Sequence, residues 1–222
     1  MPRAIKPLLF FHALFGVLGG MAIVYAGAQR GMVLLFLAIA YNLLIPAIAL
    51  WRGYNLWLTA WIFLLPVSVL QIFPDWMLVS VLQTLAFPDL GVYRIAGVVP
   101  LYFTLLWIAL LLPVTLISDA VPKYNYAVCA VLSAVLFGAV EVIATPMQVW
   151  QPLFTEQAPL KMTANVAWYV LLAEMLLGVA CLVGYRATQR TSYRVQLFTG
   201  MAIPVFYAGA LGLSYLLLER IF

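Results

Sequence analysis

The chain has 222 residues, of which 67% are hydrophobic and only 8% are charged, whereas a soluble domain carries about 25% charged residues. A mean hydropathy of +1.10 excludes a water-soluble surface. The apolar runs are long enough for membrane-spanning helices rather than barrel strands. We therefore expect a single integral membrane domain over residues 1–222. Its net charge of +4 is typical of a membrane orientation signal and does not indicate a nucleic-acid partner.

The apolar runs predict an all-α, polytopic bundle of about seven transmembrane helices in the cell membrane. A shorter apolar segment begins at Pro74 and is too short to span, so after the third span we expect a short helix that either lies in the interface or re-enters the membrane. Asp75 would then be a solvated charge at an interface turn. Prolines inside spans predict kinks near Pro46, Pro66, Pro113 and Pro204. The expected spans are residues 7–28, 31–50, 55–73, 95–118, 125–149, 163–184 and 196–217.

Polar and small residues in the first two spans have several interpretations. His12, the only histidine, is either a hydrogen-bonded core residue or a proton relay. Asn42 lies in the middle of a span, where an amide often bonds to a neighbouring helix. Gly16 and Gly20 have the GxxxG spacing that can mark close helix packing.

Two carboxylates lie inside predicted spans, and they are the candidate catalytic residues. An ionisable group in a span costs roughly 2.5–3.5 kcal/mol on insertion scales and usually faces a bundle interior. Glu141 shares a helical face with Thr145 and Gln148, which predicts a polar stripe. Glu174 shares its face with small residues such as Gly178, which would let a helix or ligand approach. Each carboxylate is therefore either a functional acid or a neutral side chain that holds helices together by hydrogen bonds.

Other kinds of functional site are absent from the sequence. One histidine is too few for a di-iron or bis-histidine haem site, and Cys129 and Cys181 do not form a CxxC pair. Both cysteines are expected to be small buried side chains. We find no P-loop, no GxGxxG and no lysine placed for a Schiff base in the last span. The sequence therefore predicts no metal and no cofactor, which leaves acid–base chemistry on an apolar molecule, or binding and transport.

Spaced residues in the second half resemble the carotenoid hydratase family of membrane proteins, which add water to lycopene-like carotenoids. The resemblance implies a hydratase active on a carotenoid. The sequence departs from that pattern because Glu141 and Pro146 are not adjacent and the loop after them contains only Trp150. Seven spans with two buried acids are also similar to membrane-bound terpene cyclases. The stretches that carry the resemblance are Gly97-Val98-Val99-Pro100-Leu101-Tyr102, Leu106-Trp107, Gly138 to Glu141 with Pro146, Trp150, and Trp168-Tyr169 with Glu174 and Gly178.

Together these features suggest a cofactor-independent enzyme that protonates an alkene of a lipid-soluble isoprenoid, followed by hydration or cyclisation. Glu141 would be the acid, with Gln148 giving access to water. Glu174 would be the base, assisted by Asn165. Aromatic side chains would stabilise the cation. Two alternatives remain open: a small proton-coupled transporter, and an assembly or lipid-binding subunit with a membrane-protein partner. The aromatic residues expected to line the cavity are Tyr102, Trp107, Trp168 and Tyr169.

The topology is testable. Seven of the eleven Lys and Arg residues fall on one side of a seven-span chain, which predicts a cytoplasmic N-terminus and an external C-terminus. We expect a cysteine added at the C-terminus, in a background with Cys129 and Cys181 replaced by alanine, to react with an impermeant thiol reagent in intact cells. A cysteine added at the N-terminus should react only after permeabilisation. Equal labelling of both termini in intact cells would contradict the seven-span topology.

Overall fold

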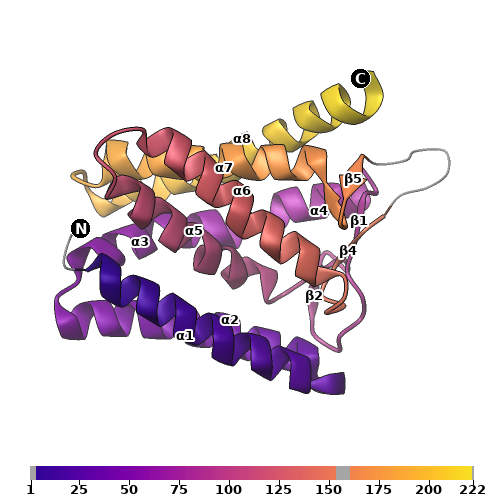
Figure 1. Ribbon diagram of the computed structural model, residues 1–222, viewed down its shortest axis with the longest axis horizontal. Helices are drawn as coiled ribbons and strands as arrows, with labels where there is room; N and C mark the ends of the chain where they lie inside the picture. Colours follow the sequence, from indigo (N-terminus) through magenta and orange to yellow (C-terminus); the bar gives the residue numbers. More distant parts are fainter. Residues whose placement is uncertain (1–3, 154–160, 222) are drawn as a thin grey trace.

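A computed structural model describes residues 4–153 and 161–221, so most of the polar loop expected between Gln151 and Met162 lies outside the described residues. Long helices run side by side along the molecule (Figure 1), and the two termini lie toward opposite ends of the bundle. The helices are α1 (Ile5–Tyr25), η1 (Gly27–Gln29), α2 (Arg30–Arg52), α3 (Asn55–Leu70), α4 (Ile72–Ser80), α5 (Phe103–Asp119), α6 (Asn125–Ala144), α7 (Trp168–Thr188), α8 (Tyr193–Tyr215) and η2 (Leu216–Ile221).

Short strands form three antiparallel pairs at one end of the bundle (Figure 1). The pairing of β1 with β4 places Leu85 opposite Pro152, and it joins segments that are far apart in the sequence. The other two pairs are local hairpins, β2 with β3 and β5 with β6. The strands are β1 (Leu85–Ala86), β2 (Arg94–Ile95), β3 (Val99–Pro100), β4 (Gln151–Pro152), β5 (Met162–Thr163) and β6 (Val166–Ala167).

The predicted all-α class is confirmed. Within residues 4–153 and 161–221, six helices are long and apolar enough to cross a membrane, and α5, with 17 residues, is a shorter apolar helix. The count of seven spans therefore stays a prediction. Prolines lie inside helices α2, α3, α5 and α8, as expected.

The predicted interfacial helix is wrong in its position. Helix α4 follows α3 after a single break at Gln71, and the two together form one candidate span over Asn55–Ser80. The Gln71 backbone N–H still donates to Val67 at 3.1 Å, and the Asp75 N–H donates to the carbonyl of Gln71 at 3.0 Å. Because the hydrogen-bonded path continues through the break, α4 extends α3 into the bundle.

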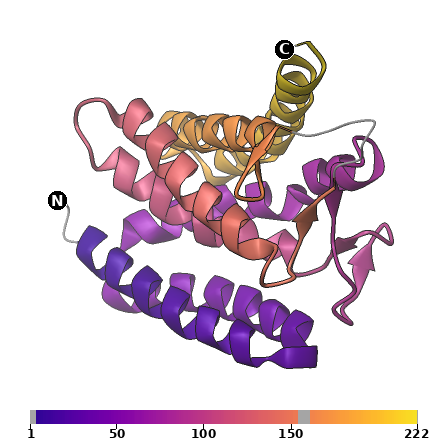
Figure 2. The ribbon, with the colours of Figure 1, turned by 45° about the vertical axis from the view of Figure 1, so that its right-hand side comes forward.

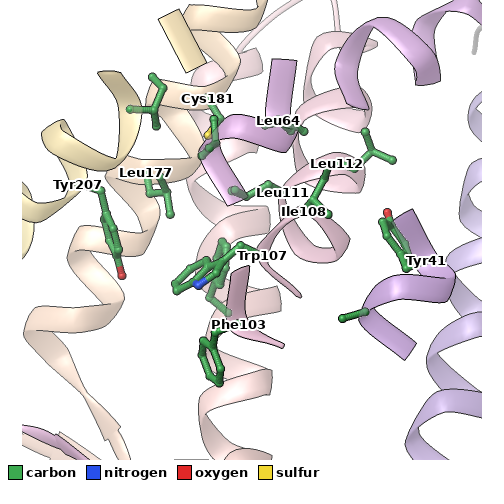
Figure 3. Packing of buried hydrophobic residues seen from close by; sticks show 14 of the residues in the cluster. Tyr41, Leu64, Phe103, Trp107, Ile108, Leu111, Leu112, Leu177, Cys181 and Tyr207 are labelled. Carbon is green, nitrogen blue, oxygen red and sulfur yellow. The ribbon is translucent and has the colours of Figure 1, made fainter. Parts of the chain in front are cut away.

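Helix α5 lies at the centre of the core, and ten of its 17 residues are buried. Figure 3 shows Trp107, Ile108 and Leu111 of this helix between Tyr207 of α8 on one side and Tyr41 of α2 on the other. A buried helix of this kind reads as apolar all round, which explains why its sequence has no clear polar face.

Asn42 and His12 both hold helices together. The Asn42 amide donates to the carbonyls of Ala38 and of Leu105 in α5, at 2.9 and 3.0 Å, and accepts from the Trp61 indole of α3 at 3.1 Å. His12 Nδ1–H can donate to the Leu8 carbonyl, which leaves Nε2 to accept from the Tyr41 hydroxyl, both at 2.8 Å. The inter-helix role of Asn42 is therefore confirmed, whereas His12 is hydrogen-bonded and its role as a proton relay stays a prediction.

The α1–α2 hairpin lies along one side of the bundle (Figure 2) and is loosely covered. Only 11% of the apolar window of α1 is buried. A Cβ added at Gly16 or Gly20 would meet no atom within 4 Å. The GxxxG spacing therefore marks no close helix contact at Gly16 or Gly20 within the described residues.

The other side of the bundle, formed by α3 and α8, is packed closely at a glycine. A Cβ added at Gly200 of α8 would lie 2.6 Å from the Phe63 carbonyl oxygen and 2.8 Å from Pro66 Cγ. Neither neighbour can move easily, because one is backbone and the other is a ring inside α3. Contact between these helices therefore requires glycine at this position.

We expect Gly200→Ala to lower the free energy of unfolding by about 1–3 kcal/mol, the usual cost of overpacking. Gly209→Ala is the matched control on the same helix, since a Cβ there meets nothing within 4 Å. Alanine has the higher helix propensity, so the control should be neutral or slightly stabilising. Thermal denaturation of both variants in mild detergent measures the difference. An equal loss in both would show that α3 and α8 do not pack as described.

Candidate functional site

Three carboxyl groups, Asp75, Glu141 and Glu174, line one cavity. They come from α4, α6 and α7, and about 50 Å³ of the cavity is open to the centres of water molecules. A space of that size has room for water. We call this space the acid cavity. Its remaining lining is mostly apolar and aromatic: Leu78, Thr84, Leu85, Phe103, Leu106, Trp107, Leu110, Phe137, Val140, Trp150, Pro152, Ala167, Tyr169, Val170 and Tyr207.

Asp75 is the carboxyl that sequence reasoning missed. It is 2% exposed, and its Oδ2 accepts a hydrogen bond of 3.1 Å from the Trp107 indole. The expectation of a solvated interface charge is wrong because α4 enters the bundle. The only signal in the sequence was an acid within a long apolar stretch. Because the segment after Pro74 was expected to be too short to span, Asp75 was not counted among the acids inside the bundle.

Glu141 lies near the end of α6 and is held by one tryptophan. The Trp150 indole N–H donates to both of its carboxyl oxygens, at 3.1 and 3.2 Å. The predicted polar stripe is wrong because α6 ends at Ala144, so Thr145 and Gln148 lie in the turns that follow it and not on a continuing helical face. Gln148 then takes a positive φ of 54° and accepts a 3.3 Å hydrogen bond from Arg30, outside the acid cavity.

Glu174 lies six residues into α7, about 9 Å from its start, and is 2% exposed. Among the described residues, its Oε2 has no hydrogen-bond partner. The ion pairs within the described residues join Arg186 to Asp119 and Arg94 to Asp89, so no cation neutralises an acid of the cavity. Charge on any one of the three acids would therefore be opposed both by burial and by charge on the other two.

Aromatic rings form much of the cavity wall. The Trp107 ring lies 5.6 Å from Phe137 and 5.8 Å from Tyr207, the latter edge to face. Phe103 and Trp150 also pack edge to face, with centroids 5.4 Å apart. Tyr207, Phe137 and Phe103 were not expected at the site, because aromatic residues in apolar helices carry no sequence mark that separates a cavity wall from ordinary core.

One end of the acid cavity is lined by the β1–β4 strand pair. Leu85 of β1 and Pro152 of β4 both line it, and they are directly paired. The Tyr169 hydroxyl donates to Thr84 Oγ1, which joins α7 to the segment before β1. The cavity thus lies where α6 ends and where α5 and α7 begin.

Four other expected residues are not in the cavity lining, Gln148 included. Tyr102 is fully buried but packs against Phe103. Trp168 is half exposed at the start of α7. Asn165 is exposed in the two-residue turn between β5 and β6, where it has φ 69° and Ala164 has φ 51°. Such a turn needs positive φ at both positions and favours asparagine at one of them, so its geometry explains Asn165.

The three carboxyls share a cavity without forming a metal site. Within residues 4–153 and 161–221, no group of three or more His, Cys, Asp or Glu side chains is arranged to hold a metal ion. The acids line the same cavity together with aromatic and aliphatic side chains. The arrangement is therefore suited to proton exchange among separate groups that face one small space.

A family model described as a domain of unknown function (DUF6989) matches residues 72–218. Every residue that lines the acid cavity falls within that range. The α1–α2 hairpin falls outside it. No curated protein and no solved structure matches the chain.

The cavity geometry makes a spectroscopic prediction. We expect the infrared spectrum of the protein at neutral pH to contain the C=O stretching band of a protonated carboxyl group, because among the described residues Glu174 has no ion-pair partner and its Oε2 has no hydrogen-bond donor. Glu174→Gln should remove intensity from that band. Asp89→Asn, which changes a highly exposed acid, should not. Loss of the band in the Asp89 variant instead would contradict this assignment.

Proposed function

We propose that this chain, which belongs to the family described as a domain of unknown function (DUF6989), is a membrane-embedded enzyme that protonates an alkene of an isoprenoid. The observation that supports this most directly is a small aromatic-walled cavity into which three acids project from three helices. Protonating an alkene requires a strong neutral acid in a dry site, a base nearby and a wall that tolerates positive charge.

Glu174 is our candidate for the acid. Among the described residues its Oε2 receives no hydrogen bond, so no donor stabilises negative charge on that oxygen. Glu141 and Asp75 each accept from an indole N–H, and a donor of that kind favours a carboxylate. We therefore exchange the roles expected from the sequence: Glu174 donates the proton, and Asp75 or Glu141 accepts one.

The reaction then balances without an added reagent. The O–H bond of Glu174 breaks, and its proton forms a C–H bond with the electron pair of the alkene, which leaves a tertiary cation. In hydration, a cavity water attacks the cation and gives a proton to the carboxylate of Asp75 or Glu141. In cyclisation, an internal alkene attacks and forms a ring carbon–carbon bond, which leaves a cyclic cation, and the carboxylate removes a proton from that cation to give the product. The proton returns to Glu174 through the waters that the cavity can hold.

The aromatic wall supports the cationic step. A cation within about 6 Å of an indole or phenol ring is attracted by the quadrupole of that ring, most strongly by tryptophan. Trp107 and Tyr207 lie beside each other in the cavity lining. Because these rings line the same cavity as the acids, a cation formed on the substrate would contact aromatic rings and not bulk water.

Deuterium incorporation tests this proposal without knowledge of the natural substrate. Protein in lipid nanodiscs would be incubated in D₂O with linear isoprenoids from geraniol to lycopene. We expect at least one of them to gain deuterium at an alkene carbon, either within a ring product or together with D₂O in a hydration product. Mass spectrometry measures both. Glu174→Gln should slow incorporation by roughly 10²–10⁴-fold, the usual contribution of a general acid.

Glu219→Gln is the control, because it makes the same change at an acid of η2 that does not line the cavity. It should keep full incorporation. The proposal fails if Glu174→Gln, Glu141→Gln and Asp75→Asn all retain wild-type incorporation. A wild-type protein that binds isoprenoids tightly but incorporates no deuterium would be a lipid-binding subunit instead.

A further inference from the structure

A second, larger cavity adjoins the acid cavity. About 250 Å³ of it is open to the centres of water molecules, and it lies between the α1–α2 hairpin and helices α5 and α6. We call it the apolar groove. Four residues line both spaces, namely Leu106, Leu110, Val140 and Trp150. The two cavities are thus separated by a wall one side chain thick, and Trp150 in that wall also holds Glu141.

The hairpin that forms one side of the groove is fixed at both ends. At the start of α1, the Trp57 indole of α3 donates to the Ala4 carbonyl at 3.1 Å, and Leu8 is fully buried. At the start of α2, Gly31 packs against the loop before β2, and a Cβ added there would lie 2.8 Å from Leu90 Cβ. Because both ends of the hairpin contact the rest of the protein, the hairpin is held in place and the groove beside it is a defined part of the fold.

Between those anchors, α1 leaves space in the groove at its glycines. Gly16 and Gly20 line the groove, and a Cβ at either would meet nothing within 4 Å. A Cβ added at Gly19, which lies between them, would be 3.5 Å from Leu37 Cδ1, an ordinary van der Waals contact. The glycines therefore widen the groove in the middle of α1, where methyl branches of a chain would find space.

We propose that the apolar groove binds the chain of a linear, methyl-branched isoprenoid, while its terminal alkene passes Trp150 and Val140 into the acid cavity. This rests on the proposed function above. An engineered cavity of about 150 Å³ binds benzene, so by proportion 250 Å³ encloses about ten carbons, or two isoprene units. The acid cavity alone is too small for such a chain, and only one layer of side chains separates it from the groove, so displacing Trp150 or Val140 would join the two spaces.

Photolabelling tests the groove directly. The probe is a farnesol analogue that carries a diazirine on its chain, added to the protein in nanodiscs and activated by light. Mass spectrometry should find the label on peptides of α1 and α2 that line the groove. Gly20→Leu fills the groove and should reduce this labelling about tenfold, the effect of displacing two methylene groups from an apolar site. Gly16→Leu is a second variant with the same expectation.

Gly212→Leu is the matched control. Gly212 is a half-exposed glycine of α8, as Gly20 is of α1, and it too has nothing within 4 Å of an added Cβ, but it does not line the groove. Its labelling should equal that of the wild type. Excess farnesol should compete with the probe, and excess hexadecanol should not.

Two results would overturn the groove proposal. One is label spread evenly over the lipid-facing helices and unchanged in Gly20→Leu. The other is equal competition by hexadecanol, which would mean that an ordinary acyl chain fills the groove. The Glu174→Gln variant separates this proposal from the proposed function. Normal groove labelling with deuterium incorporation that does not depend on the acids refutes the chemistry alone, whereas acid-dependent incorporation without groove labelling refutes the groove alone.

Discussion

A carboxyl group enclosed by apolar helices needs the protein to replace the water it has lost, and this requirement governs the structure around Asp75, Glu141 and Glu174. Two of the acids are supplied with an indole donor, and among the described residues Oε2 of the third is left without a partner. Burying such a group costs free energy, so the surrounding helices must pack well enough to offset it. The central, mostly buried helix α5 meets that demand.

Helix α6 gives two neighbouring residues different tasks. Consecutive residues point about 100° apart around a helix, so Val140 lies in the wall that both cavities share and Glu141 faces the acid cavity. Trp150, which follows the end of α6, lies in the same wall and donates to Glu141. A substrate that moves the Trp150 ring would therefore also change the hydrogen bond that this ring donates to Glu141.

The helices could be predicted from the sequence because long apolar runs leave the backbone few other ways to satisfy its hydrogen bonds in a membrane. Glu141, Glu174, Trp107 and Tyr169 could likewise be found, since each is unusual or bulky inside such a run. Asp75 could not, because the register of α4 depends on how the chain continues through Gln71. Asn165 and Trp168 were misplaced for a related reason: turn geometry and the exact start of α7 decide where they point.

The acid cavity lies at one end of the bundle, beside the strand pairs. Under the proposed function, protons used there are exchanged with the aqueous compartment at that end. A cell that keeps different acidity on the two faces of its membrane would then set the proton supply through the direction in which the chain inserts. The same sequence in the opposite orientation would work against a different pH. Insertion by the translocation machinery would thus help to determine reaction rate as well as location.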